Sequence, residues 1–129
     1  MISLLGLEYV DNGRDIKTDG GLDCWGLVRE VYKRELKVDL PEFLLTQKDL
    51  RINEFEKQSE SNWEETKVIK PYAVVLFRLK DYTYHCGVVM PDKRRFIHCR
   101  KPCVMIESLD ANIWKRLRVG YYEYKKTDN

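Results

Sequence analysis

The stretch that decides the fold is GGLDCWGLV, residues 20–28 of a chain of 129 residues. Two glycines end a polar loop, and Cys24 then opens a helix whose apolar residues recur at helical spacing. A helix N-terminus carries partial positive charge and N–H groups without intrahelical partners. Both stabilise a thiolate, and the same N–H groups can stabilise an oxyanion once that thiolate attacks a carbonyl. Cys24 is therefore a candidate nucleophile, although a small buried cysteine is the commoner role at such a position.

The composition is that of an ordinary soluble globular chain, with 43% hydrophobic and 34% charged residues. We expect one domain, residues 1–129. The net charge of +2 does not indicate a surface that binds nucleic acid. We expect no membrane span, since no stretch approaches about 20 apolar residues, and the N-terminus lacks the charged start of a signal peptide. These features predict cytoplasmic synthesis, and the four cysteines fit reduced thiols better than a disulfide framework.

The order of the expected elements favours an α+β domain. Helical periodicity covers residues 24–36, and a weaker helical pattern covers 46–58. Apolar or alternating runs predict strands at 72–79, 83–90, 94–99, 103–107 and 119–124. Helices followed by an antiparallel meander indicate N-terminal helices packed on a central antiparallel sheet.

Both histidines of the chain, His85 and His98, fall on expected strands that one hairpin joins. If Pro91 and Asp92 form a two-residue turn, the histidines face each other directly and point to the same face of the sheet. A slip of one residue would separate them. In this register His85 can take the proton from Cys24, and His98 can orient the His85 ring.

A tetrahedral zinc site is the alternative use of these residues, since His85, Cys86, His98, Cys99 and Cys103 supply enough ligands. Neighbouring residues of a strand point to opposite faces, so neither His–Cys pair can aim at one ion without distortion. The chain also has no CxxC pair. The sequence therefore favours no metal and no cofactor, with Cys86 and Cys99 in the core behind the histidine face.

Three motifs resemble the NlpC/p60 family of papain-like cell-wall cysteine peptidases in order and approximate spacing. They are DCWGLV at 23–28, HCGVV at 85–89 and FIH at 96–98, and the resemblance extends over about residues 8–124. It implies a papain-like fold. Cys24 would be the nucleophile, His85 the general base and His98 the orienting third member.

The resemblance also gives roles to two residues near the nucleophile. Tyr9 falls where the family has a tyrosine that faces the active site, and its hydroxyl would assist the oxyanion hole. Asp23 would bind the free amine of the substrate, although capping the helix is an equally good role for it. The chain departs from the family at Pro71-Tyr72-Ala73, where a polar Gly-Asp pair is usual.

The family typically hydrolyses the bond between D-γ-glutamyl and a diamino acid in peptidoglycan stem peptides, through an acyl-enzyme. VREVY at 28–32 and the closing segment from Trp114 to GYY at 120–122 resemble the phage-tail and prophage branch. That implies phage tail proteins as partners, and a virion or tail-associated enzyme that acts at the cell wall. Two alternatives stay open: a structural tail-assembly module with a hydrolase fold, and an amidase or acyltransferase on another γ-glutamyl or acyl substrate.

Overall fold

Six strands form one antiparallel sheet within the part of the chain that the computed structural model describes, residues 1–40, 63–79 and 84–125. Their order across the sheet is β1-β6-β2-β3-β4-β5. The strands are β1 (Trp63–Thr66), β2 (Val74–Arg78), β3 (Tyr84–Val89), β4 (Arg95–Arg100), β5 (Cys103–Ser108) and β6 (Arg118–Tyr124). The helices are the 3-10 turn η1 (Ile2–Leu4), α1 (Ile16–Asp19), α2 (Cys24–Val31), the π-helical turn η2 (Tyr32–Leu36) and α4 (Asn112–Leu117).

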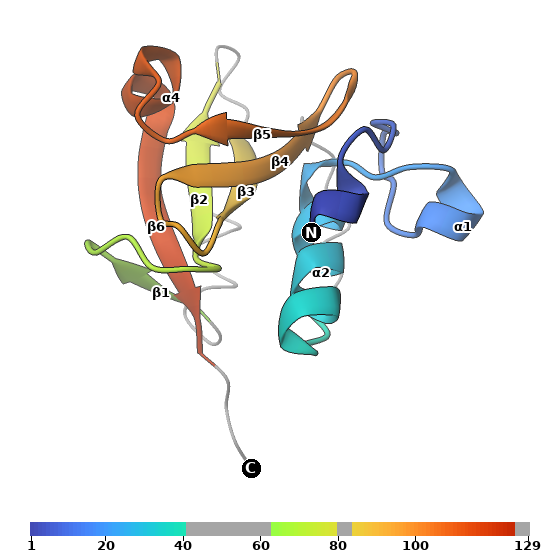
Figure 1. The fold of residues 1–129 in the computed structure, drawn as a ribbon, viewed down its shortest axis with the longest axis horizontal. Helices are drawn as coiled ribbons and strands as arrows, with labels where there is room; N and C mark the ends of the chain where they lie inside the picture. The colour runs from blue at the N-terminus through green and yellow to red at the C-terminus, as the bar shows by residue number, and fades with distance from the viewer. Residues whose placement is uncertain (41–62, 80–83, 126–129) are drawn as a thin grey trace.

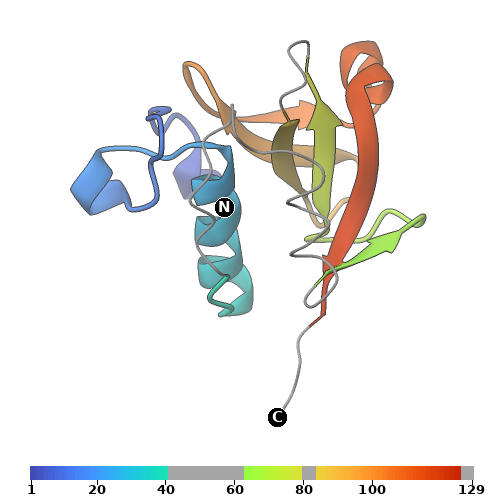
Figure 2. The same cartoon turned by 180° about the vertical axis from the view of Figure 1, so that it is seen from behind.

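The two faces of the sheet pack against different helices. Helix α2 stands beside one face, and α4 packs on the other side near β2 and β6 (Figures 1 and 2). Alternate residues of each strand point to opposite faces. The α2 face gathers Leu27, Val28, Val31, Leu76, Cys86, Val88, Ile97 and Cys99. The opposite face, called here the α4 face, gathers Val75, Phe77, Val89, Phe96 and Trp114. The central strands are thus buried on both sides.

The expected α+β architecture is present, with corrections. Helical structure covers 24–36 as predicted. The five expected strands correspond to β2–β6, and each expected end lies within two residues of the observed end. Strand β1, helices α1 and α4 and the 3-10 turn η1 were missed. The prediction of a sequential meander is wrong for β6, which lies between β1 and β2. The helical pattern at 46–58 falls outside the described residues.

The β3–β4 hairpin has a longer loop than predicted. Met90 N–H donates to the Arg95 carbonyl at 2.8 Å, which leaves residues 91–94 as a four-residue loop. Asp92 Oδ1 closes this loop by accepting from the N–H groups of Arg94 and Arg95, at 2.9 and 3.1 Å. Gly87 therefore pairs with His98. The direct pairing of the two histidines was wrong by two residues, and a shift of two keeps both on one face.

Candidate active site

The N-terminus of α2 is fixed by Asp23 and by a close approach of two glycines. Asp23 Oδ1 accepts from the Gly26 N–H at 2.8 Å, which is the bond of an N-cap. Its other oxygen is paired with Arg14, and both side chains are buried. A Cβ on Gly26 would lie 2.1 Å from the carbonyl oxygen of Gly13, so the loop and the helix can meet only with glycine there. Of the two roles expected of Asp23, the structure contains the cap.

Cys24 is the first residue of α2, as predicted, and its side chain is only 1% exposed. The thiols of Cys86 and Cys24 are hydrogen-bonded, and this bond together with burial raises the pKa of Cys86 well above its ordinary value. Cys99 Sγ donates to the Leu22 carbonyl at 3.2 Å, and burial raises the pKa of Cys99 to about 12. Cys86 and Cys99 thus pack in the core behind the histidine face, as predicted, and Cys86 contacts Cys24.

Tyr9 lies in the loop that leads to α2. It bridges Leu22, two residues before Cys24, and its hydroxyl donates to Asp11 Oδ1 at 2.9 Å. Burial raises the pKa of Tyr9, and the nearby carboxylates and the Cys24 thiol add to that rise. The hydroxyl therefore stays protonated and able to donate. Its role at an oxyanion remains a prediction.

A chain of hydrogen bonds links four side chains on the α4 face of the sheet. His85 Nε2 lies 2.7 Å from His98 Nδ1, and His98 Nε2 lies 2.6 Å from Glu107 Oε2. Trp114 Nε1 donates to the other oxygen of Glu107 at 3.1 Å. The Phe77 ring stacks on His85 with centroids 6.2 Å apart. Neighbouring positions on β3, β4 and β5 thus bring the two histidines together, as the sequence predicted.

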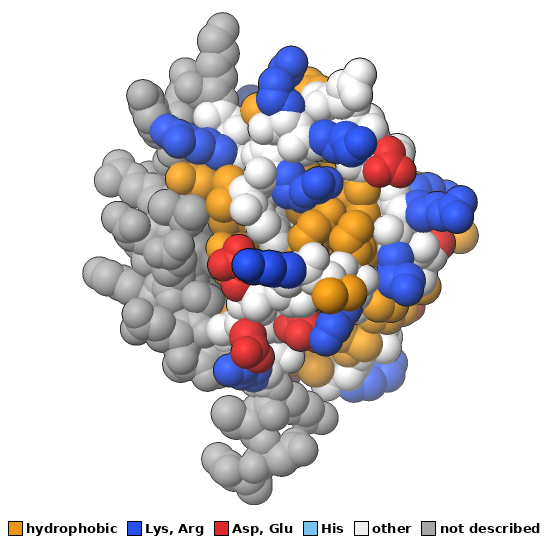
Figure 3. Space-filling model, turned by 90° about the vertical axis from the view of Figure 1, so that its left-hand side faces the viewer, with side chains coloured by type: hydrophobic (Ala, Val, Ile, Leu, Met, Phe, Trp, Pro, Cys, Tyr) orange, Lys and Arg blue, Asp and Glu red, His pale blue; other side chains and the backbone are white. Residues whose placement is uncertain are grey.

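Burial keeps both imidazoles neutral near pH 7. The side chains of His85 and His98 have no exposed surface. No histidine atoms are visible on the face that carries α4 and β6 in Figure 3. Burial, and then the neighbouring His98 ring, lower the pKa of His85 well below its ordinary value. Burial lowers the pKa of His98 to about 4, because it outweighs the opposite effect of Glu107. Each ring therefore carries a single proton.

The thiol and the imidazoles lie on opposite faces of β3. Cys86 contacts Cys24 on the α2 face, whereas His85, its chain neighbour, contacts Phe77 and His98 on the α4 face. Among the described residues, no hydrogen bond joins Cys24 to His85. Direct contact between the nucleophile Cys24 and the base His85 stays a prediction. One strand separates the two halves of the site.

The sequence interpretation missed three residues of these two halves: Arg14, Glu107 and Trp114. For Glu107 a signal existed, since it is the one acidic residue of the apolar run 103–107. Trp114 was noted only as part of a closing segment. Nothing in the sequence pointed to Arg14 as the partner of Asp23, because the contact depends on how the loop folds back.

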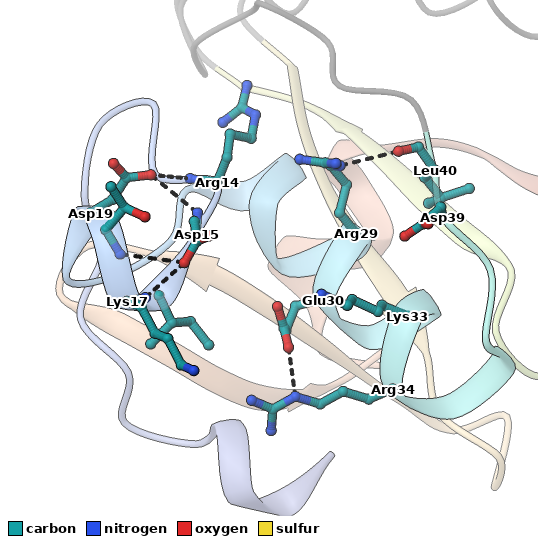
Figure 4. Close-up of a pocket in the computed structure, with 12 residues that line it drawn as sticks. Arg14, Asp15, Lys17, Asp19, Arg29, Glu30, Lys33, Arg34, Asp39 and Leu40 are labelled. Atoms are coloured by element: carbon teal, nitrogen blue, oxygen red, sulfur yellow. Dashed lines mark hydrogen bonds and ion pairs between the residues drawn. The ribbon is translucent and has the colours of Figure 1, made fainter.

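A pocket of about 720 Å³ lies between α1 and the outer side of α2 (Figure 4). Its lining mixes acidic and basic side chains, and includes Arg14, which also pairs with Asp23 beside the nucleophile. Arg29 Nε donates to the Leu40 carbonyl at 3.2 Å, and Arg34 pairs with Glu30. A peptide with free carboxylates and amines would find partners of both signs here.

Two further properties concern only the described ranges 1–40, 63–79 and 84–125. No group of three or more His, Cys, Asp or Glu side chains there is arranged to hold a metal ion. None of the helices there has the length and apolar character required to cross a membrane.

The family follows from a comparison of the sequence with family models. The model described as "NlpC/P60 family" matches residues 6–123, nearly the whole chain. The chain belongs to the NlpC/P60 family. Members of this family are generally cell-wall peptidases. The comparison with curated proteins found no match.

A solved structure agrees with this NlpC/P60 assignment at the level of the fold. It is described as similar to a lipoprotein of the NLP/P60 family from Staphylococcus aureus, with a TM-score of 0.69 and 19% sequence identity. The match covers 98% of this chain and 39% of that one. The chain thus spans well under half the length of that protein.

Proposed function

We propose that this NlpC/P60 chain is a cysteine endopeptidase that hydrolyses peptidoglycan stem peptides, at the bond between D-γ-glutamyl and a diamino acid. The observation that carries the proposal is the hydrogen-bonded His85–His98 pair in a family member whose only helix-capped cysteine, within the described residues, is Cys24. Membership of the family supports the class of substrate, and the thiol and imidazole side chains support the acyl-transfer chemistry.

The proposed reaction is acyl transfer through the Cys24 sulfur. His85 takes the proton of the Cys24 thiol and becomes an imidazolium. The thiolate attacks the carbonyl carbon of the γ-glutamyl bond, and the α2 N-terminus with the Tyr9 hydroxyl stabilises the oxyanion. The tetrahedral intermediate collapses to a thioester as imidazolium His85 protonates the leaving amine. His85 then takes a proton from water, and the hydroxide attacks the thioester carbonyl carbon. The C–S bond breaks, the γ-glutamyl acid leaves, and the imidazolium returns its proton to the Cys24 sulfur. His98 orients the His85 ring throughout.

This reaction requires the Cys24 thiol and the His85 ring to meet, and β3 separates them in the described conformation. Reaching contact involves breaking the thiol–thiol bond to Cys86. We therefore expect a substrate-bound structure to show the α2 N-terminus and the start of β3 rearranged, so that Cys24 leaves Cys86 and reaches His85.

Digestion of purified peptidoglycan tests the proposal. Wild type is expected to release new amino termini, Cys24→Ala to release none, and Cys103→Ala, which removes the half-buried thiol of β5, to match wild type. Mass spectrometry of the muropeptides identifies the bond. Activity that survives Cys24→Ala contradicts the cysteine mechanism, and a rate that is flat between about pH 5 and 8 contradicts a histidine base.

We also propose that the enzyme acts at the cell wall as part of a phage or prophage tail. The support is the resemblance of residues 28–32 and of the segment from Trp114 to Tyr122 to that branch. Detection of the chain by mass spectrometry in purified virions is the expected result. Its absence from virions, with metabolic genes beside its own gene, would favour an amidase or acyltransferase on another substrate.

A second candidate is a structural module that keeps the hydrolase fold without catalysis. The observation that favours it is the placement of Cys24 and His85 on opposite faces of β3. The same digestion decides between the two. A folded wild type that releases no muropeptide, and whose Cys24 resists alkylation in the presence of peptidoglycan, would favour the structural module.

A further inference from the structure

Glu107 holds the far end of the imidazole chain with both of its oxygens. Oε2 contacts His98 Nε2 at 2.6 Å, and Oε1 accepts from Trp114 Nε1 at 3.1 Å. Glu107 stands opposite Phe96 in the β4–β5 ladder, diagonal to His98 on the same face. Its side chain is 35% exposed, whereas His98 is fully buried, so the carboxylate can keep contact with water while it holds a buried ring.

The positions of the protons follow from these contacts. A carboxylate oxygen only accepts, so His98 Nε2 carries the hydrogen. His98 is neutral because burial lowers its pKa to about 4, so its Nδ1 has a lone pair and accepts. His85 Nε2 must then be the donor in the bond between the rings. Because His85 is also neutral, its second nitrogen, Nδ1, is the basic one.

We propose that Glu107 is a positioning residue that selects the tautomers of both histidines and so makes Nδ1 of His85 the base. This inference rests on the proposed peptidase function. Glu107 does not touch the reacting atoms and acts through His98. Trp114 is part of the arrangement, because its N–H occupies the second oxygen and fixes the plane of the carboxylate.

Glutamine cannot replace Glu107 in this role. Its amide has one accepting oxygen and one donating nitrogen, and two donors, His98 Nε2–H and Trp114 Nε1–H, face it. If the oxygen faces His98, two N–H groups confront each other at Trp114. If the oxygen faces Trp114, the amide donates to His98, which then carries its proton on Nδ1. That second arrangement reverses the bond between the rings and places the proton of His85 on Nδ1.

The test combines Glu107→Gln with the rescue variant Glu107→Gln/Trp114→Phe. Removing the indole N–H lets the amide oxygen face His98 without conflict, so the double variant should restore what the single variant loses. Glu64→Gln, on the exposed surface of β1, controls for loss of a negative charge. The readouts are the tautomers, from long-range 1H–15N spectra of the imidazoles, and kcat and KM on a muropeptide.

We expect Nε2–H tautomers for both histidines in wild type and Glu64→Gln, and a mixture in Glu107→Gln. We also expect kcat to fall about 10-fold to 100-fold with little change in KM, and the double variant to recover both. Unchanged tautomers in a folded Glu107→Gln protein would overturn the inference. If that variant does not fold, the wild-type spectra decide, and a His98 that carries its proton on Nδ1 overturns the inference.

The two proposals fail in different ways. A wild type without activity would contradict the peptidase function, and the spectra would still decide whether Glu107 selects the tautomers. An active enzyme in which Glu107→Gln keeps full kcat would leave the peptidase in place and remove the role of Glu107.

Discussion

Gly87 makes room for the two histidines to meet. It stands opposite His98 in the β3–β4 ladder, and a Cβ there would lie 2.9 Å from the Ile97 carbonyl oxygen and 3.0 Å from the Cβ of His98. Gly87→Ala must therefore displace β4 or tilt His98 away from His85. We expect urea denaturation to show a loss of about 1–3 kcal/mol in the free energy of unfolding. The 15N signals of both imidazoles should shift.

Gly120→Ala in β6 is the matched control. Its Cβ would contact the carboxylate end of Glu65 at 3.0 Å and nothing else closer than 3.7 Å, and that flexible side chain can move. We expect a change below about 0.5 kcal/mol, as for an ordinary surface substitution. Equal losses in the two variants would show that crowding at His98 is not the cause.

Asp23 supports the nucleophile through two separate interactions, a helix cap and a pair with buried Arg14. Asp23→Asn keeps an oxygen for the Gly26 N–H and loses the charge, whereas Asp23→Ala loses both. We expect stability to fall in the order wild type, Asp23→Asn, Asp23→Ala, with a total loss of about 3 kcal/mol. Thermal and urea unfolding measure this, and an Asp23→Ala protein within about 0.5 kcal/mol of wild type would contradict it.

At the residue scale, the sequence predicted where a side chain lies along its helix or strand better than it predicted which other side chains it contacts. The place of Cys24 at the helix start was predictable, because capping and glycine spacing act within a few residues of the chain. The alternation of a strand also showed that His85 and Cys86 point opposite ways. It could not show which of the two faces α2, because that depends on packing between segments some 60 residues apart.

At the scale of elements, the β3–β4 hairpin illustrates how far a turn can be inferred. The composition of residues 91–95 indicated a turn correctly, but the bonds from Asp92 Oδ1 to two backbone N–H groups extend the loop to four residues. Such a side-chain bond replaces a ladder bond and moves the register. The missed elements are short: η1 has three residues, α1 has four, α4 has six, and β1 has four with two exposed glutamates.

Strand β1 is held at the edge of the sheet by Trp63, its one buried residue. The Trp63 ring lies 5.1 Å from Tyr124, 5.9 Å from Tyr32 and 6.2 Å from Trp25, between centroids. It thereby connects the sheet edge to α2. Trp63→Ala is expected to cost about 3–5 kcal/mol, and hydrogen exchange should show β1 and β6 losing protection before β3 and β4.

Val68→Ala serves as the control for Trp63→Ala, since Val68 follows β1 and is 65% exposed. It should leave stability and exchange unchanged. Uniform loss of protection across the sheet in Trp63→Ala would contradict a local role for β1.

On the scale of the whole molecule, the sheet separates two kinds of chemistry. The thiols of Cys24, Cys86 and Cys99 lie on the α2 face and the imidazoles on the α4 face. The last strand, β6, lies between β1 and β2, so β1 joins the sheet only through β6. No local pattern encodes that pairing, which is why the expected meander failed at this strand while the α+β class held.

Burying two neutral histidines makes the stability of the whole fold depend on pH. His98 has a folded pKa of about 4, against an ordinary value near 6.5 in the unfolded chain. Between these values the unfolded chain binds a proton that the folded protein excludes, so stability falls as the pH falls. Asp92, whose pKa is lowered to about 2, contributes only in a more acidic range. Asp23, whose pKa is raised by burial, acts in the opposite direction.

We therefore expect the free energy of unfolding to be constant above about pH 6.5 and to fall by about 3 kcal/mol by pH 4 from His98 alone. His85 shifts in the same direction and adds to the loss. Urea denaturation at half-unit pH steps measures the slope. His98→Asn should be less stable at pH 7 and show a shallower slope between pH 6.5 and 4, because the group that binds the extra proton is gone. An equal slope in wild type and His98→Asn would mean that carboxylates, and not the buried imidazoles, control acid unfolding.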